Sequence, residues 1–140
     1  MSLLDIKNLN VSIHNTKILK NISFSVNEGE IFGIVGESGS GKSMTALGLM
    51  GLLPDGAKIT GSAILSEKDL LKISEEEMCT LRGNAIGMIF QEPMTALNPV
   101  QTIGNQVAET LIIHGRAKRN KALKIAREKL NRVGLTEEQF

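Results

Sequence analysis

The sequence lacks several features that whole classes of protein need. It contains no tryptophan or tyrosine, and its single cysteine, Cys79, excludes an internal disulfide and fits a reducing cytosol. No apolar run approaches the length of a membrane span, and the first residues have neither the basic nor the apolar region of a secretory signal. The formal net charge is only +1, so bulk electrostatics give no reason to expect nucleic acid as a partner. The 140 residues suffice for one domain with a core.

The most informative segment is a glycine-rich loop. It reads Gly36-Glu37-Ser38-Gly39-Ser40-Gly41-Lys42-Ser43 and matches the phosphate-binding P-loop pattern G-x-x-x-x-G-K-[ST]. The apolar run 31–35 before it predicts a strand buried on both faces, and residues 44–50 after it predict a helix. Strand, glycine loop and helix are the context that the motif needs, so a nucleoside triphosphate is the first ligand to expect.

Each residue type in this loop suits a phosphate group. Glycines allow backbone conformations closed to other residues, so that successive N–H groups can point inward and form an anion-binding nest. The positive end of the following helix adds to that field. Lys42 can reach the β- and γ-phosphates as a point charge, and the Ser43 hydroxyl can bind Mg²⁺. A glycine-rich turn with a surface lysine is the alternative, but a chance match to the whole pattern is rare.

Hydrophobic periodicity predicts further elements on both sides of the loop. Ser74 to Glu77 resembles a capping box and predicts a helix to about residue 81. A later helix, residues 118–132, is densely basic, which fits either a solvated face or a surface for acidic lipid or RNA. The remaining predictions are strands at 3–13, 22–27, 60–65 and 85–90, a proline-bearing loop at 91–101, and a helix with Ile103, Val107 and Leu111 on one face.

Four segments resemble the ATP-binding subunits of ABC transporters, and most of all the subfamily that serves oligopeptide, dipeptide and nickel importers. The most specific is Gly87-Met88-Ile89-Phe90-Gln91-Glu92-Pro93-Met94-Thr95-Ala96-Leu97-Asn98-Pro99. The others are residues 40–54, 61–71 and 122–135. The resemblance spans nearly the whole chain. It implies an α/β P-loop NTPase fold of the ABC ATPase type, with a β-rich N-terminal part, a P-loop core and the start of a helical subdomain.

The resemblance also implies a division of the chain and roles for single residues. Residues 1–90 would form the ATP-binding core, residues 91–101 the Q-loop and residues 102–140 the start of the helical subdomain. Residues 36–44, including Met44, would hold the nucleotide, and Gln91 would join Ser43 as a magnesium ligand. The family's adenine-stacking aromatic falls at Ile13 or His14 here. His14 could stack its imidazole on the base, and a solvated histidine at a strand end is the alternative.

Parts that the family needs for hydrolysis are not found in these residues. No apolar strand ends in Asp-Glu, no Leu-Ser-Gly-Gly-Gln-like signature occurs, and His14 and His114 are both misplaced for a switch histidine. The expectation is therefore an N-terminal part of a longer subunit, without a catalytic residue of its own, whose general base would lie beyond Phe140. A non-enzymatic remnant and a soluble P-loop NTPase are the alternatives.

The resemblance further implies partners and a location. The cofactors would be ATP and Mg²⁺, and the transported solute would be a peptide, nickel or a related small solute. The partners would be membrane-spanning permease subunits, a second ATP-binding subunit and, indirectly, a solute-binding protein. The subunit would sit peripherally on the cytoplasmic face of the inner membrane.

Overall fold

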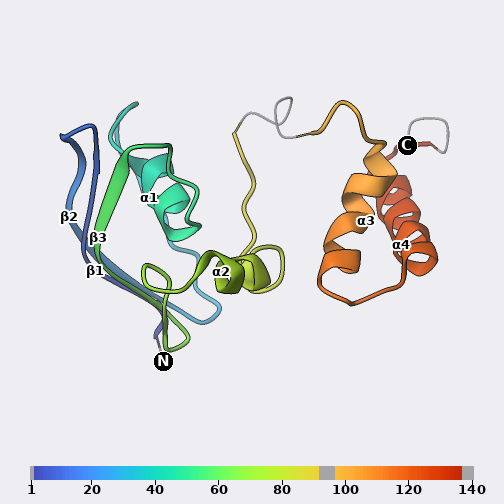
Figure 1. Ribbon diagram of the computed structural model, residues 1–140, viewed down its shortest axis with the longest axis horizontal. Helices are drawn as coiled ribbons and strands as arrows, with labels where there is room; N and C mark the ends of the chain where they lie inside the picture. The colour runs from blue at the N-terminus through green and yellow to red at the C-terminus, as the bar shows by residue number, and fades with distance from the viewer. Residues whose placement is uncertain (1, 92–96, 137–140) are drawn as a thin grey trace. The chain divides into compact units, whose positions relative to one another are not determined.

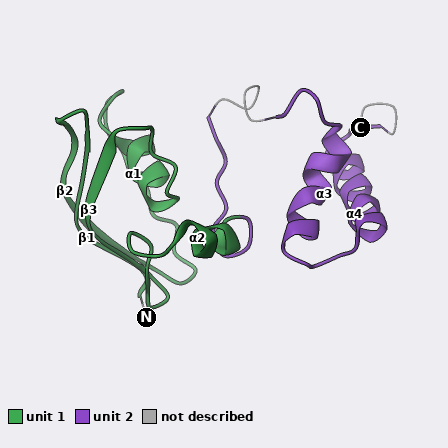
Figure 2. Ribbon diagram, viewed as in Figure 1, with its two compact units in different colours: residues 1–82 green, residues 83–140 purple. Residues whose placement is uncertain are grey.

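The computed structural model describes residues 2–91 and 97–136. The chain divides into two compact units, residues 1–82 and 83–140, which Figure 2 shows in different colours. The first unit contains a sheet and two helices, and the second contains a pair of helices (Figure 1). No helix among the described residues is both long and apolar enough to cross a membrane.

The sheet of the first unit is antiparallel, with four strands in the order β2-β1-β3-β4. The strands are β1 (Ser2–Ile13), β2 (Thr16–Asn27), β3 (Ala57–Leu65) and β4 (Lys68–Asp69). Ile22, Phe24 and Val26 are half-buried and alternate with exposed polar residues, which confirms the predicted period of two. Leu9 and Val11 of the central strand β1 are fully buried and form the middle of the core.

Helix α1 (Lys42–Leu49) follows the glycine loop directly, as predicted. Its C-terminal end is a Schellman motif: Gly51 has a φ of 65°, its amide bonds Gly48 O, and the Leu52 amide bonds Leu47 O at 2.8 Å. Helix α2 (Glu75–Leu81) begins with the predicted capping box, in which Ser74 accepts from the Glu77 amide and Glu77 accepts from the Ser74 amide. The C-terminal end of α1 and the N-terminal end of α2 are thus fixed by local sequence.

The second unit packs α3 (Ile103–Ile113) against α4 (Arg119–Arg132). Its core consists of small side chains: Ala108 on α3 and Ala122 and Ala126 on α4 are fully buried. The predicted α3 face is therefore only partly right, because Val107 is 38 % exposed and Gly104 and Ala108 face the core instead. Leu130 of α4 is also buried, at 6 % exposed, and Leu111 and Leu123 pack partly buried against the alanines.

Two predicted strands are wrong, and the first of them was also expected to be buried on both faces. Residues 31–35 and 85–90 form no strand, and Ile31, Val35 and Ile89 are 99, 93 and 98 % exposed. An apolar run becomes a buried strand only when neighbouring strands supply hydrogen-bond partners on its edges and side chains on its faces. Among the described residues the sheet consists of β1 to β4 alone, so residues 31–35 have no strand to pair with. In residues 85–90 only Ile86 forms an isolated bridge, and its carbonyl accepts from the Gly83 amide at 2.8 Å.

Candidate functional site

The glycine loop ends at an open helix N-terminus. Gly41 is the N-cap of α1 with a φ of 92°, a left-handed conformation that favours glycine. Since glycine has no side chain, no cap hydrogen bond reaches the amides of the first turn, and the first helical bond is Thr45 N to Gly41 O at 2.9 Å. The first-turn amides and the positive end of the helix dipole are therefore available to an anion.

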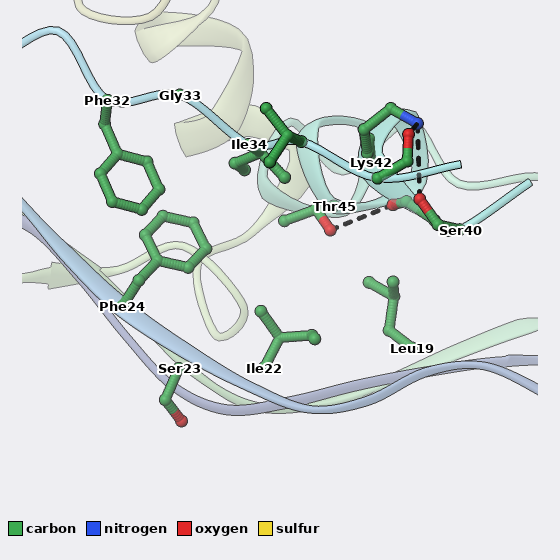
Figure 3. A pocket seen from close by; sticks show the side chains of 13 residues that line it. Leu19, Ile22, Ser23, Phe24, Phe32, Gly33, Ile34, Ser40, Lys42 and Thr45 are labelled. Atoms are coloured by element: carbon green, nitrogen blue, oxygen red, sulfur yellow. Dashed lines mark hydrogen bonds between the residues drawn. The ribbon is translucent and has the colours of Figure 1, made fainter. Parts of the chain in front are cut away.

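The Lys42 ammonium group lies over the same loop. Its Nζ donates to Gly36 O at 2.8 Å and to Glu37 O at 2.7 Å, and it lies 3.4 Å from Ser40 Oγ (Figure 3). The loop carbonyls thus hold the Lys42 ammonium group at the mouth of the loop. A phosphate group bound there could replace these carbonyls as its hydrogen-bond acceptor. Exchanging two carbonyl acceptors for a phosphate oxygen would strengthen its hydrogen bonds, because charge-assisted bonds to anions are stronger than bonds to neutral groups.

Close packing around two glycines gives the loop its shape. An added Cβ at Gly41 would lie 2.3 Å from Leu19 Cδ2, and one at Gly36 would lie 2.7 Å from Ser40 Oγ. Leu19, which is 3 % exposed, therefore forms the floor beneath Gly41. Thr45 is buried behind the loop, where its Oγ1 donates to Gly41 O at 3.1 Å. The loop is a cradle that side chains at these two glycines would fill.

A cavity of about 450 Å³ lies between this loop and β2. Figure 3 shows Leu19 and Ile22 pointing into it from β2, with the loop and α1 on the opposite side. Phe24 and Phe32 stack at one end, with ring centroids 4.8 Å apart and ring planes at 9°. The ring pair explains why Phe32 is only 42 % exposed while Ile31 and Val35 of the same segment are 99 and 93 % exposed, and it attaches this segment to β2.

The other predicted site residues lie at different places. Ser43 is exposed and Met44 half-buried in the first turn of α1, next to Lys42. His14 is exposed in the turn between β1 and β2, where its ring edge lies against Gly56: an added Cβ there would be 2.7 Å from His14 Cε1. Gln91 is exposed and belongs to the second unit, whereas Ser43 belongs to the first. The Q-loop residues 92–96 lie outside the described residues.

Three residues around the loop and its helix were not identified from the sequence: Leu19 and Thr45, which contact the loop, and Arg82, which contacts the far end of α1. Ile18 and Leu19 interrupt the polar half of β2, and that apolar pair was the available signal. Arg82 follows α2, donates from Nε to Met50 O at 2.8 Å and pairs with Glu75. The hydrogen bond from Arg82 lowers the pKa of Glu75 below its usual value, and the same bond raises the pKa of Arg82. No local sequence pattern predicts the hydrogen bond from Arg82 to Met50, because the two residues are 32 positions apart.

Metal-binding clusters of three or more histidine, cysteine, aspartate or glutamate side chains do not occur among residues 2–91 and 97–136. The Ser43 hydroxyl, exposed beside the loop, suits a Mg²⁺ ion that is also held by phosphate oxygens, because Mg²⁺ keeps few protein ligands at such sites. The loop therefore fits a magnesium–triphosphate complex better than a free metal ion.

Comparison with known proteins agrees with this geometry. The ABC transporter family matches residues 19–140. A probable peptide ABC transporter ATP-binding protein of Sinorhizobium fredii is 45 % identical over 96 % of this chain and 42 % of its own. An oligopeptide transport ATP-binding protein of Bacillus subtilis is 45 % identical, with 96 % and 43 % covered. A dipeptide transport ATP-binding protein of Lactococcus lactis is 44 % identical, with 94 % and 40 % covered. The chain spans about two fifths of the length of these relatives.

Solved structures give the same fold. An ATP-binding cassette solved as a dimer in a post-hydrolysis state, bound to ADP and Pi, superposes with a TM-score of 0.79 at 27 % identity. The match covers 97 % of this chain and 59 % of that one. The α/β fold class expected from the sequence, the N-terminal part of an ABC ATPase domain, is therefore confirmed.

Proposed function

Because the chain belongs to the ABC transporter family, we propose that it binds MgATP at the loop formed by residues 36–43. The observation that carries the proposal is the pairing of an uncapped α1 N-terminus at Gly41 with the Lys42 ammonium group held over the same loop. A triphosphate is bound by backbone amides that donate hydrogen bonds to its oxygens and by a lysine that neutralises part of its charge. The similar dimeric ATP-binding cassette, which was solved bound to ADP and Pi, supports the same ligand class.

Each residue of the site takes one role in this proposal. The amides of residues 36–43 and of Met44 hold phosphate oxygens, and Lys42 neutralises the β- and γ-phosphates. Ser43 binds Mg²⁺, and Gln91 completes the magnesium shell from the segment that follows the first unit. Mg²⁺ held by Ser43 and Gln91 would supply positive charge that offsets the negative charge of the phosphate oxygens. His14 meets the adenine with its imidazole face; its edge contact with Gly56 leaves the ring exposed for this.

We further propose that the chain acts in the ATP-binding subunit of a membrane importer for peptides, nickel or related small solutes. The names of the relatives from Sinorhizobium, Bacillus and Lactococcus, all peptide transport proteins, support this substrate class. The partners would be permease subunits in the membrane, a second ATP-binding subunit and, through the permease, a solute-binding protein. The subunit would lie on the cytoplasmic face of the inner membrane.

The 140 residues by themselves are proposed to bind ATP without turning it over at a rate typical of the family. Phosphoryl transfer needs a positioned water and charge neutralisation in addition to binding. No Asp-Glu strand end, signature motif or suitably placed histidine is found in the sequence to supply them. A steady-state phosphate-release assay on this chain is expected to give background rates, and family-like turnover would overturn the proposal.

Labelling by a photoreactive ATP analogue tests the binding site. Lys42→Ala removes the ammonium group and is expected to abolish labelling, because the loop amides alone do not neutralise the triphosphate. Lys58→Ala removes an exposed lysine on β3 and is the matched control, expected to label like the parent chain. Unchanged labelling of Lys42→Ala would place the nucleotide elsewhere.

A further inference from the structure

The three long strands of the sheet carry lysine charge that acidic side chains do not balance. Strands β1, β2 and β3 contain Lys7, Lys17, Lys20 and Lys58 but only one acidic residue, Asp5. The Asp5 carboxylate is already paired with Lys7 at 2.7 Å. Among residues 2–91 and 97–136, Lys17 and Lys58 form neither an ion pair nor a side-chain hydrogen bond. Both ammonium groups are therefore available to an anion.

The strand register places these two lysines on either side of one serine. Ser12 of β1 lies opposite Lys17 of β2 and opposite Lys58 of β3, and these three residues form the lysine row. Residues directly opposite each other in antiparallel strands point to the same face of the sheet. Val11, which precedes Ser12, is 1 % exposed and faces the core, so the lysine row lies on the opposite face. Because neighbouring strands are about 4.8 Å apart, the two lysine Cα atoms are about 10 Å apart, with Ser12 midway.

A cavity of about 320 Å³ lies at the lysine row. Its lining consists of Asn10, Val11, Ser12, Lys17, Leu19, Lys58 and Thr60. The Asn10 side chain is already engaged, since Nδ2 donates to Asn8 O at 2.6 Å and Oδ1 accepts from the Asn21 amide at 2.9 Å. The hydroxyl groups of Ser12 and Thr60 form no side-chain hydrogen bond with the described residues, so both can donate to a ligand. The cavity thus offers two positive charges and two hydroxyl donors.

This cavity is separate from the phosphate loop. The loop and Lys42 line the other cavity, between the loop and β2, and of the described lining residues the two cavities share only Leu19. Figure 1 shows α1, the helix that follows the loop, on one side of the sheet. The Leu19 side chain lies beneath Gly41 on that side, whereas the lysine row lies on the other. An anion over Ser12 is therefore not one of the phosphates that the loop would hold.

We propose that the lysine row binds a small, soluble phosphate dianion on the face of the sheet opposite the core. The ammonium groups of Lys17 and Lys58 approach it from two sides, and the hydroxyl groups of Ser12 and Thr60 donate to its oxygens. Without a ligand the two like charges repel each other, and a dianion between them replaces this repulsion by attraction. A phosphate group suits the site better than a carboxylate because it brings a second charge and three acceptor oxygens. The proposal does not depend on what residues 36–43 bind.

Amide chemical shifts of the whole chain, followed while inorganic phosphate is added at constant ionic strength, test this site. At about pH 8, where phosphate is mainly the dianion, saturable shifts are expected at residues 12, 17, 58 and 60. Lys17→Gln and Lys58→Gln should each weaken this binding by about fivefold, the effect of one exposed ion pair, and the double variant should abolish it. Lys68→Gln removes an exposed lysine on β4, outside the cavity, and is the matched control that should bind as the parent does.

Further variants separate the lysine row from the loop. Lys42→Ala should remove any phosphate response of residues 36–43 and keep the response of Ser12, and Lys58→Ala should do the reverse. Replacing Lys17 and Lys58 together by arginine keeps both charges and should restore binding to within about threefold of the parent. Saturation at Ser12 in a parent chain whose loop does not respond would still support the lysine row.

Two results would overturn the proposal. Shifts at Ser12 that rise without saturating, or that persist when Lys17 and Lys58 are both glutamine, would indicate an adventitious ion only. Binding to phosphatidylcholine vesicles that contain phosphatidic acid, without any response to inorganic phosphate, would assign the lysine row to a lipid surface instead.

Discussion

Replacing Leu19 by alanine tests whether this residue supports the phosphate loop in addition to stabilising the fold. Leu19 is 3 % exposed and its Cδ2 fills the space against Gly41. Truncating a buried leucine to alanine typically costs about 3 kcal/mol, through lost burial and the cavity left behind. For a chain of 140 residues that cost lowers the melting temperature by about 10 °C.

Leu19→Ala should also weaken the binding of MgATP. Without its floor, Gly41 is free to leave the left-handed conformation that turns the first-turn amides toward the loop, so the cradle is no longer preorganised. We expect MgATP to bind about tenfold more weakly, which corresponds to about 1.4 kcal/mol. The assay is calorimetric titration at a temperature well below both melting transitions, together with thermal unfolding of the same samples.

Leu9→Ala is the matched control. Leu9 is also fully buried and also a leucine, but it lies on β1 and is not a neighbour of the loop glycines. It should lose as much thermal stability as Leu19→Ala and bind MgATP within about twofold of the parent. Equal weakening of binding in both variants, or in neither, would refute the idea that Leu19 supports the loop.

Two further predictions concern the stability of the first unit. Ser74→Ala removes the capping box of α2 and should cost about 1 kcal/mol in chemical denaturation; an unchanged midpoint would show that α2 does not need its cap. Burial of Asp69 by itself would raise the pKa of its carboxyl group. Hydrogen bonds from Lys72, the Ala63 amide and the Leu71 amide outweigh this effect, so the pKa lies below its usual value. A lowered pKa in the folded state stabilises the protein above pH about 4 and the gain is lost as the pH falls through the folded value. Asp69→Asn should therefore flatten the acid limb of a stability–pH curve measured by urea unfolding, and an identical limb in both proteins would contradict this.

Local sequence patterns predicted those parts of the fold that local interactions determine. The capping box at Ser74 and the alternation of Ile22, Phe24 and Val26 were read correctly, because each depends on residues a few positions apart. The runs 31–35 and 85–90 were predicted as strands, the first of them buried on both faces, and neither forms one, since a strand depends on neighbouring strands that periodicity does not specify. The same holds for α3, where the pairing with α4 selects alanine and glycine for the core.

In the candidate site, too, the parts set by contiguous residues were predicted and the parts set by distant residues were not. The loop and Lys42 follow from a motif whose residues are contiguous, and the structure brings Lys42 to the carbonyls of Gly36 and Glu37. Leu19, 22 residues before Gly41, packs beneath that glycine, whereas Arg82, 41 residues after it, bonds the opposite end of α1. Contacts between residues so far apart in the sequence are not specified by a local motif. Roles for His14 and Gln91 came from family resemblance and stay predictions.

Binding of magnesium nucleotide to the folded chain tests the central claim most directly. Titration of the chain with MgATP in a calorimeter is expected to give saturable heat with one site per chain, and Lys42→Ala, shown to be folded by circular dichroism, should give none. A folded parent chain that releases no heat, or a Lys42→Ala variant that binds as the parent does, would contradict the assignment of residues 36–43 as the nucleotide site.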